Sequence, residues 1–271
     1  MLFLSHTLAR VAPPFTMEQV MISARLMRMF PHAGGDGLED WGTLSAADLK
    51  SGSPKQRGRT YFDAPDIGLS AGVWDCTAFE GTMAPYSVDE FMILLEGSVT
   101  VTEASGRATR VEAGEAFVIP RGLNCAWKQD GYVRKIFVIY QNPVAPVPAR
   151  PAADHVIKLD LGATLVPCAG PDPALLNGAE PQCAEHVVYR DASGQLTVGL
   201  WSATPYDRKA TPFGRYELMH FLEGQVDLHD GGTSGQAFQA GETIFVPKGV
   251  PLGWRNQTDV KKIFVILMPN G

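Results

Sequence analysis

The strongest feature of the chain is an internal repeat with a constant spacing of 127 residues. The segment Glu90–Gly97 reads EFMILLEG, and Glu217–Gly224 reads ELMHFLEG. The run KIFVI, which begins at Lys135, recurs unchanged from Lys262. A repeat without gaps over this length indicates one structural unit used twice. The 271 residues are therefore expected to form two similar domains.

The repeat sets the expected domain boundaries. They are an N-terminal extension at 1–37, a first domain at 38–142, a proline-rich linker at 143–155 and a second domain at 156–271. Within the extension, apolar residues between Met17 and Phe30 (Met17, Val20, Met21, Leu26, Met27 and Phe30) would line one face of a short helix. The alternative is that the true start is Met17 or Met21.

Both modules consist of short apolar segments separated by glycine and proline. Such segments occur at 67–79, 90–95, 111–119 and 133–140, and a glycine follows the second at Gly97. Segments of this length with frequent turns and almost no helical periodicity are typical of strands. The sequence therefore predicts an all-β sandwich or barrel in each module.

Composition and charge exclude several classes of partner. The net charge of −6 and the pI near 5.5 argue against nucleic acid or an anionic membrane surface. No apolar run approaches the roughly 18 residues of a transmembrane helix, and no signal peptide is recognisable. The four cysteines contain no CxxC pair, so they are expected to be reduced thiols in a cytoplasmic protein. The expected partner is a small-molecule ligand, and both a monomer and a homodimer stay open.

The order of motifs in both modules resembles the cupin family. Each module carries, in sequence, a tryptophan, a glutamate, LEG, AGE, a proline and glycine one residue apart, a second tryptophan and KIFVI. Within that family the pattern is similar to the ureidoglycine aminohydrolase and ethanolamine-utilisation group, over roughly residues 40–142 and 157–270. The resemblance implies two tandem jelly-roll barrels, that is, a bicupin. It also implies aminohydrolase-like activity on a small nitrogen-containing metabolite, and the alternative is a non-catalytic sensor or carrier.

The metal ligands that this resemblance implies are mostly missing. Cupins hold Mn, Fe, Ni or Zn with three histidines and a glutamate. The histidine positions are taken by Ala84, Tyr86 and Cys125 in the first module, and by Thr211, Phe213 and Leu252 in the second. Only Glu90 and Glu217 are retained. No metal cofactor is therefore expected, and a divalent metal held by Tyr86, Glu90 and Cys125 is the alternative.

The two retained glutamates lie in apolar strands and need partners there. Lys135 and Lys262 each begin an apolar strand and are the candidates. Such a pair either fixes the barrel or lines a polar pocket for an amine, amide or carboxylate. Trp127 and Trp254 are likewise either core residues or aromatic surfaces on which a ligand stacks.

A comparison of the two modules predicts that the ligand binds in the N-terminal barrel. Tyr86 and Cys125 carry functional groups there, whereas Phe213 and Leu252 would only fill the second barrel. If the protein is an enzyme, the catalytic candidates are Tyr86, Glu90 and Lys135. The full set of candidate ligand-binding residues is Tyr86, Glu90, Met92, Cys125, Trp127, Lys135, Glu217, Trp254 and Lys262.

Overall fold

The computed structural model describes residues 26–29, 37–144, 151–232 and 235–269. Within these residues the only helical elements are two short 3-10 turns, η1 (Ala46–Asp48) and η2 (Pro173–Leu175). The predicted all-β fold is confirmed. No helix in the described part of the chain is long and apolar enough to cross a membrane.

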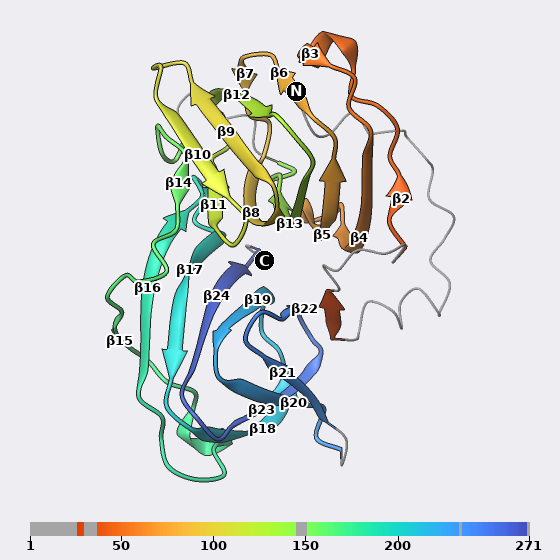
Figure 1. The fold of residues 1–271 in the computed structure, drawn as a ribbon. Helices are drawn as coiled ribbons and strands as arrows, with labels where there is room; N and C mark the ends of the chain where they lie inside the picture. Colours follow the sequence, from red (N-terminus) through yellow and green to blue (C-terminus); the bar gives the residue numbers. More distant parts are fainter. Residues whose placement is uncertain (1–25, 30–36, 145–150, 233–234, 270–271) are drawn as a thin grey trace. The chain divides into compact units, whose positions relative to one another are not determined.

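Two sheets face each other in the N-terminal barrel (Figure 1). One sheet has the order β14-β11-β8-β13-β5-β4-β2, and the other has the order β10-β9-β12-β6-β3 with β7 beside β12. The strands are β2 (Glu39–Asp40), β3 (Leu49–Gly52), β4 (Gln56–Ala64), β5 (Leu69–Cys76), β6 (Phe79–Gly81), β7 (Ala84–Pro85), β8 (Asp89–Glu96), β9 (Ser98–Glu103), β10 (Ala108–Glu112), β11 (Ala116–Ile119), β12 (Asn124–Gln129), β13 (Val133–Tyr140) and β14 (Ile157–Lys158).

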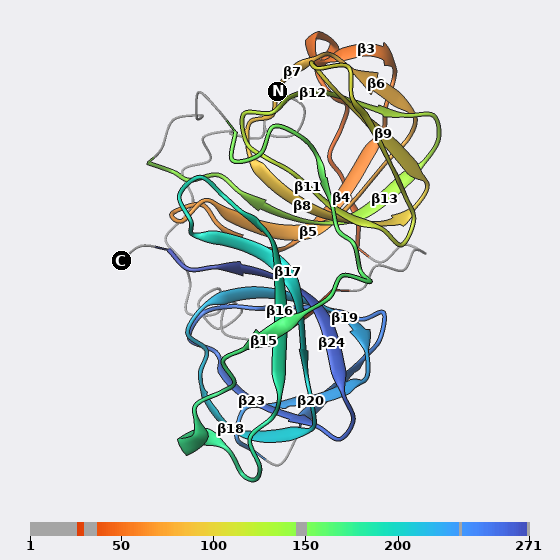
Figure 2. The same cartoon turned by 90° about the vertical axis from the view of Figure 1, so that its left-hand side faces the viewer.

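The C-terminal barrel repeats this plan. Its sheets have the orders β1-β22-β19-β24-β17-β16-β15 and β18-β23-β20-β21, and β16, β17 and β24 run side by side in Figure 2. The strands are β1 (Met27–Met29), β15 (Val166–Cys168), β16 (Cys183–Arg190), β17 (Leu196–Ala203), β18 (Tyr206–Pro212), β19 (Tyr216–Glu223), β20 (Gln225–His229), β21 (Gly235–Gln239), β22 (Thr243–Val246), β23 (Pro251–Asn256) and β24 (Val260–Leu267).

The 127-residue offset seen in the sequence is also the offset between equivalent strands. It relates both ends of β5 to those of β17, of β8 to β19, and of β13 to β24. Even the edge pairing is kept, since Glu39 lies opposite Gly58 in the first barrel and Val166 lies opposite Glu185 in the second. Residues at equivalent repeat positions can therefore be compared directly.

A short strand that precedes each module completes the sheet of the other module's barrel. β1 pairs with β22, with Met27 opposite Phe245, and β14 pairs with β11, with Ile157 opposite Val118. The residues Met27–Met29 thus form a strand and not part of a helix, and Leu26 before them is not helical either. The other residues of the predicted helix, which include the alternative starts Met17 and Met21, and part of the linker lie outside the described residues.

The two compact units of the chain follow this exchange of strands. The first compact unit includes the described residues 37–144, 151–159 and 191–194, and the second includes 26–29, 160–190 and those from 195 onward. β14 follows the expected boundary at residue 156, and its backbone hydrogen bonds to β11 join it to the N-terminal barrel.

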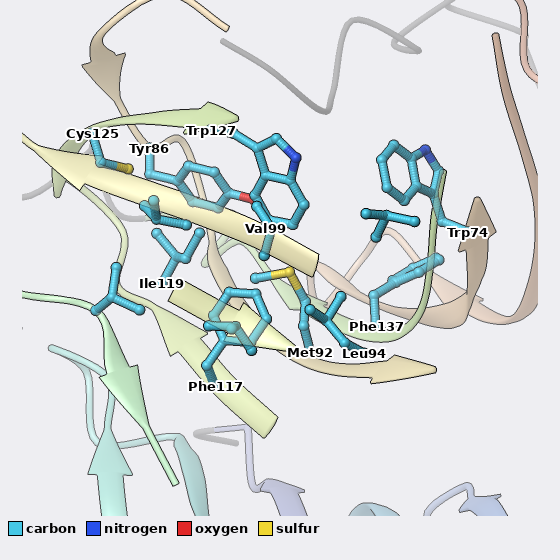
Figure 3. Close-up of a cluster of buried hydrophobic side chains, with 14 of the residues drawn as sticks. Trp74, Tyr86, Met92, Leu94, Val99, Phe117, Ile119, Cys125, Trp127 and Phe137 are labelled. Carbon is cyan, nitrogen blue, oxygen red and sulfur yellow. The ribbon is translucent and has the colours of Figure 1, made fainter. Parts of the chain in front are cut away.

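Each barrel has its own apolar core between its two sheets. In the N-terminal barrel, Met92, Phe117 and Trp127 point into this space from three different strands (Figure 3). Gly72 in β5 allows the neighbouring chain to approach closely, because a Cβ there would lie 2.3 Å from the Arg59 carbonyl oxygen and 2.7 Å from the Phe137 ring. The repeat keeps a glycine at the equivalent position, Gly199.

We expect Gly72→Ala to destabilise the N-terminal barrel by about 1–3 kcal/mol, because an extra methyl group in a packed core forces neighbouring atoms to move. The urea midpoint of that barrel should fall accordingly. Gly131→Ala is the matched control, since a Cβ added at that position would meet nothing within 4 Å. An unchanged midpoint for Gly72→Ala would contradict the close approach.

Candidate functional site

The C-terminal barrel contains a cavity of about 310 Å³. This volume lies at the lower end of the range of small-molecule sites. Five charged side chains line it, namely Glu185, Arg208, Arg215, Glu217 and Lys262. Aromatic rings form much of the remaining wall, namely Trp201, Tyr206, Phe213, Trp254 and Phe264. A concave apolar wall with a few converging polar groups is the usual form of a ligand site.

A buried carboxylate held by two cations lies in the wall of this cavity. Glu217 projects from β19 and has no exposed surface. Its Oε1 accepts a hydrogen bond from Lys262 Nζ at 2.7 Å, and its Oε2 accepts one from Arg215 Nε at 2.8 Å. Burial alone would raise the pKa of Glu217, but these two positive charges outweigh it and hold the pKa below its usual range. Glu217 is therefore a carboxylate anion in the folded protein.

Two tryptophans flank the lysine of this pair. The Lys262 ammonium lies 4.9 Å from the Trp201 ring centroid and 5.2 Å from that of Trp254. Burial lowers the pKa of Lys262, and the Glu217 charge opposes that shift. Since the rings present their electron-rich faces to the ammonium, they replace part of the hydration that burial removes.

Tyr206 and Arg208 enter the cavity from β18. The Tyr206 ring stacks on Trp254 with 5.9 Å between centroids, and burial raises the pKa of its phenol, which stays protonated. Arg208 donates from Nη2 to the Leu252 carbonyl oxygen at 2.9 Å. Its Nε is buried and has no hydrogen-bond partner among the described residues. Burial, together with the charge of Arg215, lowers the pKa of Arg208.

The equivalent polar group in the N-terminal barrel is packed closely by its neighbours. Lys135 Nζ donates to Glu90 Oε1 at 2.8 Å and lies 3.1 Å from Met92 Sδ, and the Tyr86 hydroxyl donates to Glu90 Oε2. Glu90 and Lys135 are each only 1% exposed. Burial, followed by the Glu90 charge, raises the pKa of Tyr86 well above its usual value. Figure 3 shows Tyr86, Met92 and Trp127 pointing into the same core.

The two barrels differ at one pair of equivalent positions, and this difference explains why the cavity is open in the second barrel. In the first barrel the Trp41 ring lies on Gly58, so that a Cβ there would be 2.3 Å from it, and it packs 6.3 Å from the Phe137 ring. The equivalent positions in the second barrel hold Cys168 and Glu185, and both line the cavity. A thiol replaces an indole, so the space that the large ring would occupy stays open.

The cysteines of the two barrels are protonated thiols. Cys168 lies opposite Cys183 across β15 and β16, and both line the cavity. Burial raises the pKa of Cys183 to about 11, and it raises the pKa of Cys125 in the other barrel to about 12. All four cysteines of the chain are free. Thiols of this kind are weak nucleophiles near neutral pH.

The described residues contain no group of three or more histidine, cysteine, aspartate or glutamate side chains arranged to hold a metal ion. The alternative metal site would consist of Tyr86, Glu90 and Cys125. The Tyr86 phenol is hydrogen-bonded to the Glu90 carboxylate, and Cys125 is a protonated thiol. Neither would bind a metal without first losing its proton. The donor set of the first barrel thus fits a transition metal poorly.

Comparison with known proteins places this double barrel in a family. The model of the EutQ-like cupin domain matches twice, over residues 64–137 and 190–264. The chain belongs to the EutQ-like cupin domain family. The match confirms the predicted bicupin, and no curated protein matches the sequence.

Solved structures share the fold of this EutQ-like cupin over most of its length. A protein of unknown function from Pseudomonas syringae pv. tomato is 27% identical, with a TM-score of 0.73, and the match covers 90% of this chain and 99% of that one. The protein Ylba from E. coli is 10% identical with a TM-score of 0.54, covering 92% and 93%. A putative glyoxylate-induced protein from Pseudomonas aeruginosa is 11% identical with a TM-score of 0.53, covering 90% and 97%.

The structure divides the candidate residues between two environments. Tyr86, Glu90, Met92, Cys125, Trp127 and Lys135 come together in the packed core of the N-terminal barrel. Glu217, Trp254 and Lys262 come together in the wall of the cavity. Phe213 and Leu252, which are expected to fill the second barrel, are buried in its apolar core and also contribute to the wall of the cavity.

Sequence reasoning missed Tyr206, Arg208 and Arg215. Comparing the modules only at the former metal-ligand positions overlooked them. The same 127-residue offset pairs Arg208 with Gly81 and Arg215 with Val88. At each of these two positions the second module has a cation and the first module has none. A comparison along the whole repeat would therefore have found both arginines.

His220 projects from β19 three residues after Glu217, as the alternation of the strand predicts for a side chain on the opposite face. Its Nδ1 lies 2.8 Å from Thr243 Oγ1. Burial lowers the pKa of His220 to about 4. The folded protein therefore keeps this imidazole neutral at pH values where the unfolded chain takes up a proton.

We expect the C-terminal barrel to lose about 2 kcal/mol of stability through His220 between pH 7 and pH 5. The stabilisation that comes from keeping His220 neutral is present above the usual histidine pKa of about 6.5. It is lost as the pH falls toward the folded pKa of about 4. Urea unfolding at the two pH values measures it. His220→Gln should flatten the pH dependence. Equal slopes for His220→Gln and the natural protein would refute this.

Proposed function

We propose that this EutQ-like cupin binds a small molecule inside its C-terminal barrel. The observation that carries the proposal is the cavity of about 310 Å³ into which Arg208, Arg215, Glu217 and Lys262 converge. The N-terminal barrel, where Tyr86 takes the place of Arg215 as the second partner of the glutamate, serves as the packed structural counterpart.

The polar groups around the cavity are better suited to hold a ligand than to transfer protons. Both oxygens of Glu217 already accept hydrogen bonds from cations, and its lowered pKa makes it a weak base. The Tyr206 phenol, with its raised pKa, is a donor and a weak acid. These features favour a metabolite-sensing or carrier role over aminohydrolase-like action on a nitrogen-containing metabolite. A cytoplasmic location stays a prediction.

Filling the cavity should abolish binding. Cys168→Trp combined with Glu185→Gly recreates the Trp41 and Gly58 pair of the first barrel. In a thermal-shift screen of small neutral, anionic and cationic metabolites, a ligand at about 100 times its Kd adds about 2.7 kcal/mol, which raises Tm by several degrees. We expect the double variant to lose that shift.

Cys125→Ala is the control in the N-terminal barrel, and it should leave the ligand-induced shift unchanged. It alters a residue of the other candidate set without touching the cavity. A shift lost in Cys125→Ala and kept in the filled variant would place the site in the N-terminal barrel and contradict the proposal.

We further expect the purified protein to carry no stoichiometric transition metal, because the histidine positions of both motifs hold other residues. Elemental analysis of the protein, purified without chelators, measures this directly. About one metal per chain, lost in Glu90→Ala, would establish the alternative site of Tyr86, Glu90 and Cys125.

A further inference from the structure

The charged side chains around the cavity do not balance. Arg208, Arg215 and Lys262 are three cations, and Glu185 and Glu217 are two carboxylates. Glu217 is bonded to both Arg215 and Lys262, so its single charge is shared between two partners. A ligand with one negative charge would neutralise the excess.

Arg208 is the cation best placed to receive that charge. Its Nη2 donates to a neutral carbonyl, and its Nε–H is buried without an acceptor among the residues that the structure describes. A guanidinium carries five N–H donors, and a buried donor that stays unpaired costs free energy. A carboxylate in the cavity would give the Arg208 guanidinium the charged partner that the Leu252 carbonyl oxygen does not supply.

The same excess is absent from the equivalent positions of the first barrel. Arg208 corresponds to Gly81 and Arg215 to Val88, and Val88 is fully buried in the N-terminal core. Both arginines thus occur in the barrel that contains the cavity. Lys262 and Glu217, in contrast, have counterparts in Lys135 and Glu90 and belong to the shared framework.

The rest of the wall selects for an apolar body. Tyr206 stacked on Trp254 presents aromatic surface, and Phe213, Met219 and Leu252 add apolar surface. A cavity of about 310 Å³ suits a compact molecule. A single excess positive charge matches a monoanion better than a doubly charged phosphate ester.

We propose that the ligand of the C-terminal barrel is a small monocarboxylate with an apolar or aromatic body, whose carboxylate binds Arg208 and Arg215. The inference rests on the proposed function and adds the chemical class of the ligand. The Arg208 guanidinium is the group that selects a carboxylate over an uncharged amide. Arg215 contributes one face of the carboxylate site while it holds Glu217 in place.

Matched acids and amides test this class directly. Benzoate with benzamide, and hexanoate with hexanamide, differ within each pair mainly in charge. Isothermal titration of the full-length protein should show each carboxylate binding at least 10-fold more tightly than its amide, because losing a hydrogen bond between charged groups typically weakens binding by about 10- to 100-fold.

Variants of Arg208 assign the preference to this side chain. Arg208→Met should weaken carboxylate binding by about 10- to 100-fold and leave amide binding nearly unchanged, and Arg208→Lys should recover part of the loss. Arg255→Met is the matched control, because Arg255 lies on β23 outside the cavity and pairs with Asp207. A melting curve for each variant confirms that it is folded.

The possible results separate this inference from the proposed function. Equal affinity for an acid and its amide overturns the inference, and so does an Arg208→Met variant that binds carboxylates normally. In either case, binding that is lost when the cavity is filled still supports the proposed function. Failure of all four probes to bind overturns the monocarboxylate assignment. Failure of the wider metabolite screen to find any ligand sensitive to Cys168→Trp with Glu185→Gly overturns the proposed function itself.

Discussion

Each barrel is organised around a buried lysine–glutamate pair, and the surrounding structure depends on it. Removing two charges from water costs several kcal/mol, which is recovered only when the geometry is good and the remaining donors and acceptors are satisfied. The nitrogen–oxygen distances are 2.8 Å for Lys135 and Glu90 and 2.7 Å for Lys262 and Glu217. Two tryptophans flank each ammonium. Neighbouring strands must therefore keep a fixed register to bring lysine, glutamate and both rings together.

The second partner of the glutamate distinguishes the two barrels. In the N-terminal barrel it is the neutral Tyr86 hydroxyl, which closes a small network within the core. In the C-terminal barrel it is Arg215, whose guanidinium also lies 5.2 Å from the Phe213 ring and is partly exposed. An added cation cannot be packed in a closed core without an anion or water. The charge of Arg215 and the open space beside it are thus consistent with each other.

The same backbone supports both arrangements because the differences lie in side chains at equivalent positions. Trp41 packs against the core of the first barrel, and at the equivalent position of the second barrel Cys168 lines the cavity. Duplication has kept the framework of Glu90, Glu217, Lys135 and Lys262 and changed the residues around it. A family match and a shared fold accordingly describe the framework, whereas any ligand specificity depends on the residues that differ.

The sequence by itself determined the double barrel. Glycine and proline spacing and strand length can be read along the chain, and the unbroken 127-residue offset recurs between equivalent strands of the two barrels. It also named one partner of each buried glutamate, Lys135 for Glu90 and Lys262 for Glu217, since a charge in an apolar strand requires one. Only the tertiary structure showed the cavity in the second barrel. Cavity volume depends on how Trp41, Gly58, Cys168 and Glu185 meet across strands that are distant in sequence. The place of β1 was likewise decided by backbone pairing with β22, a contact between residues more than 200 positions apart that no local pattern of the chain expresses.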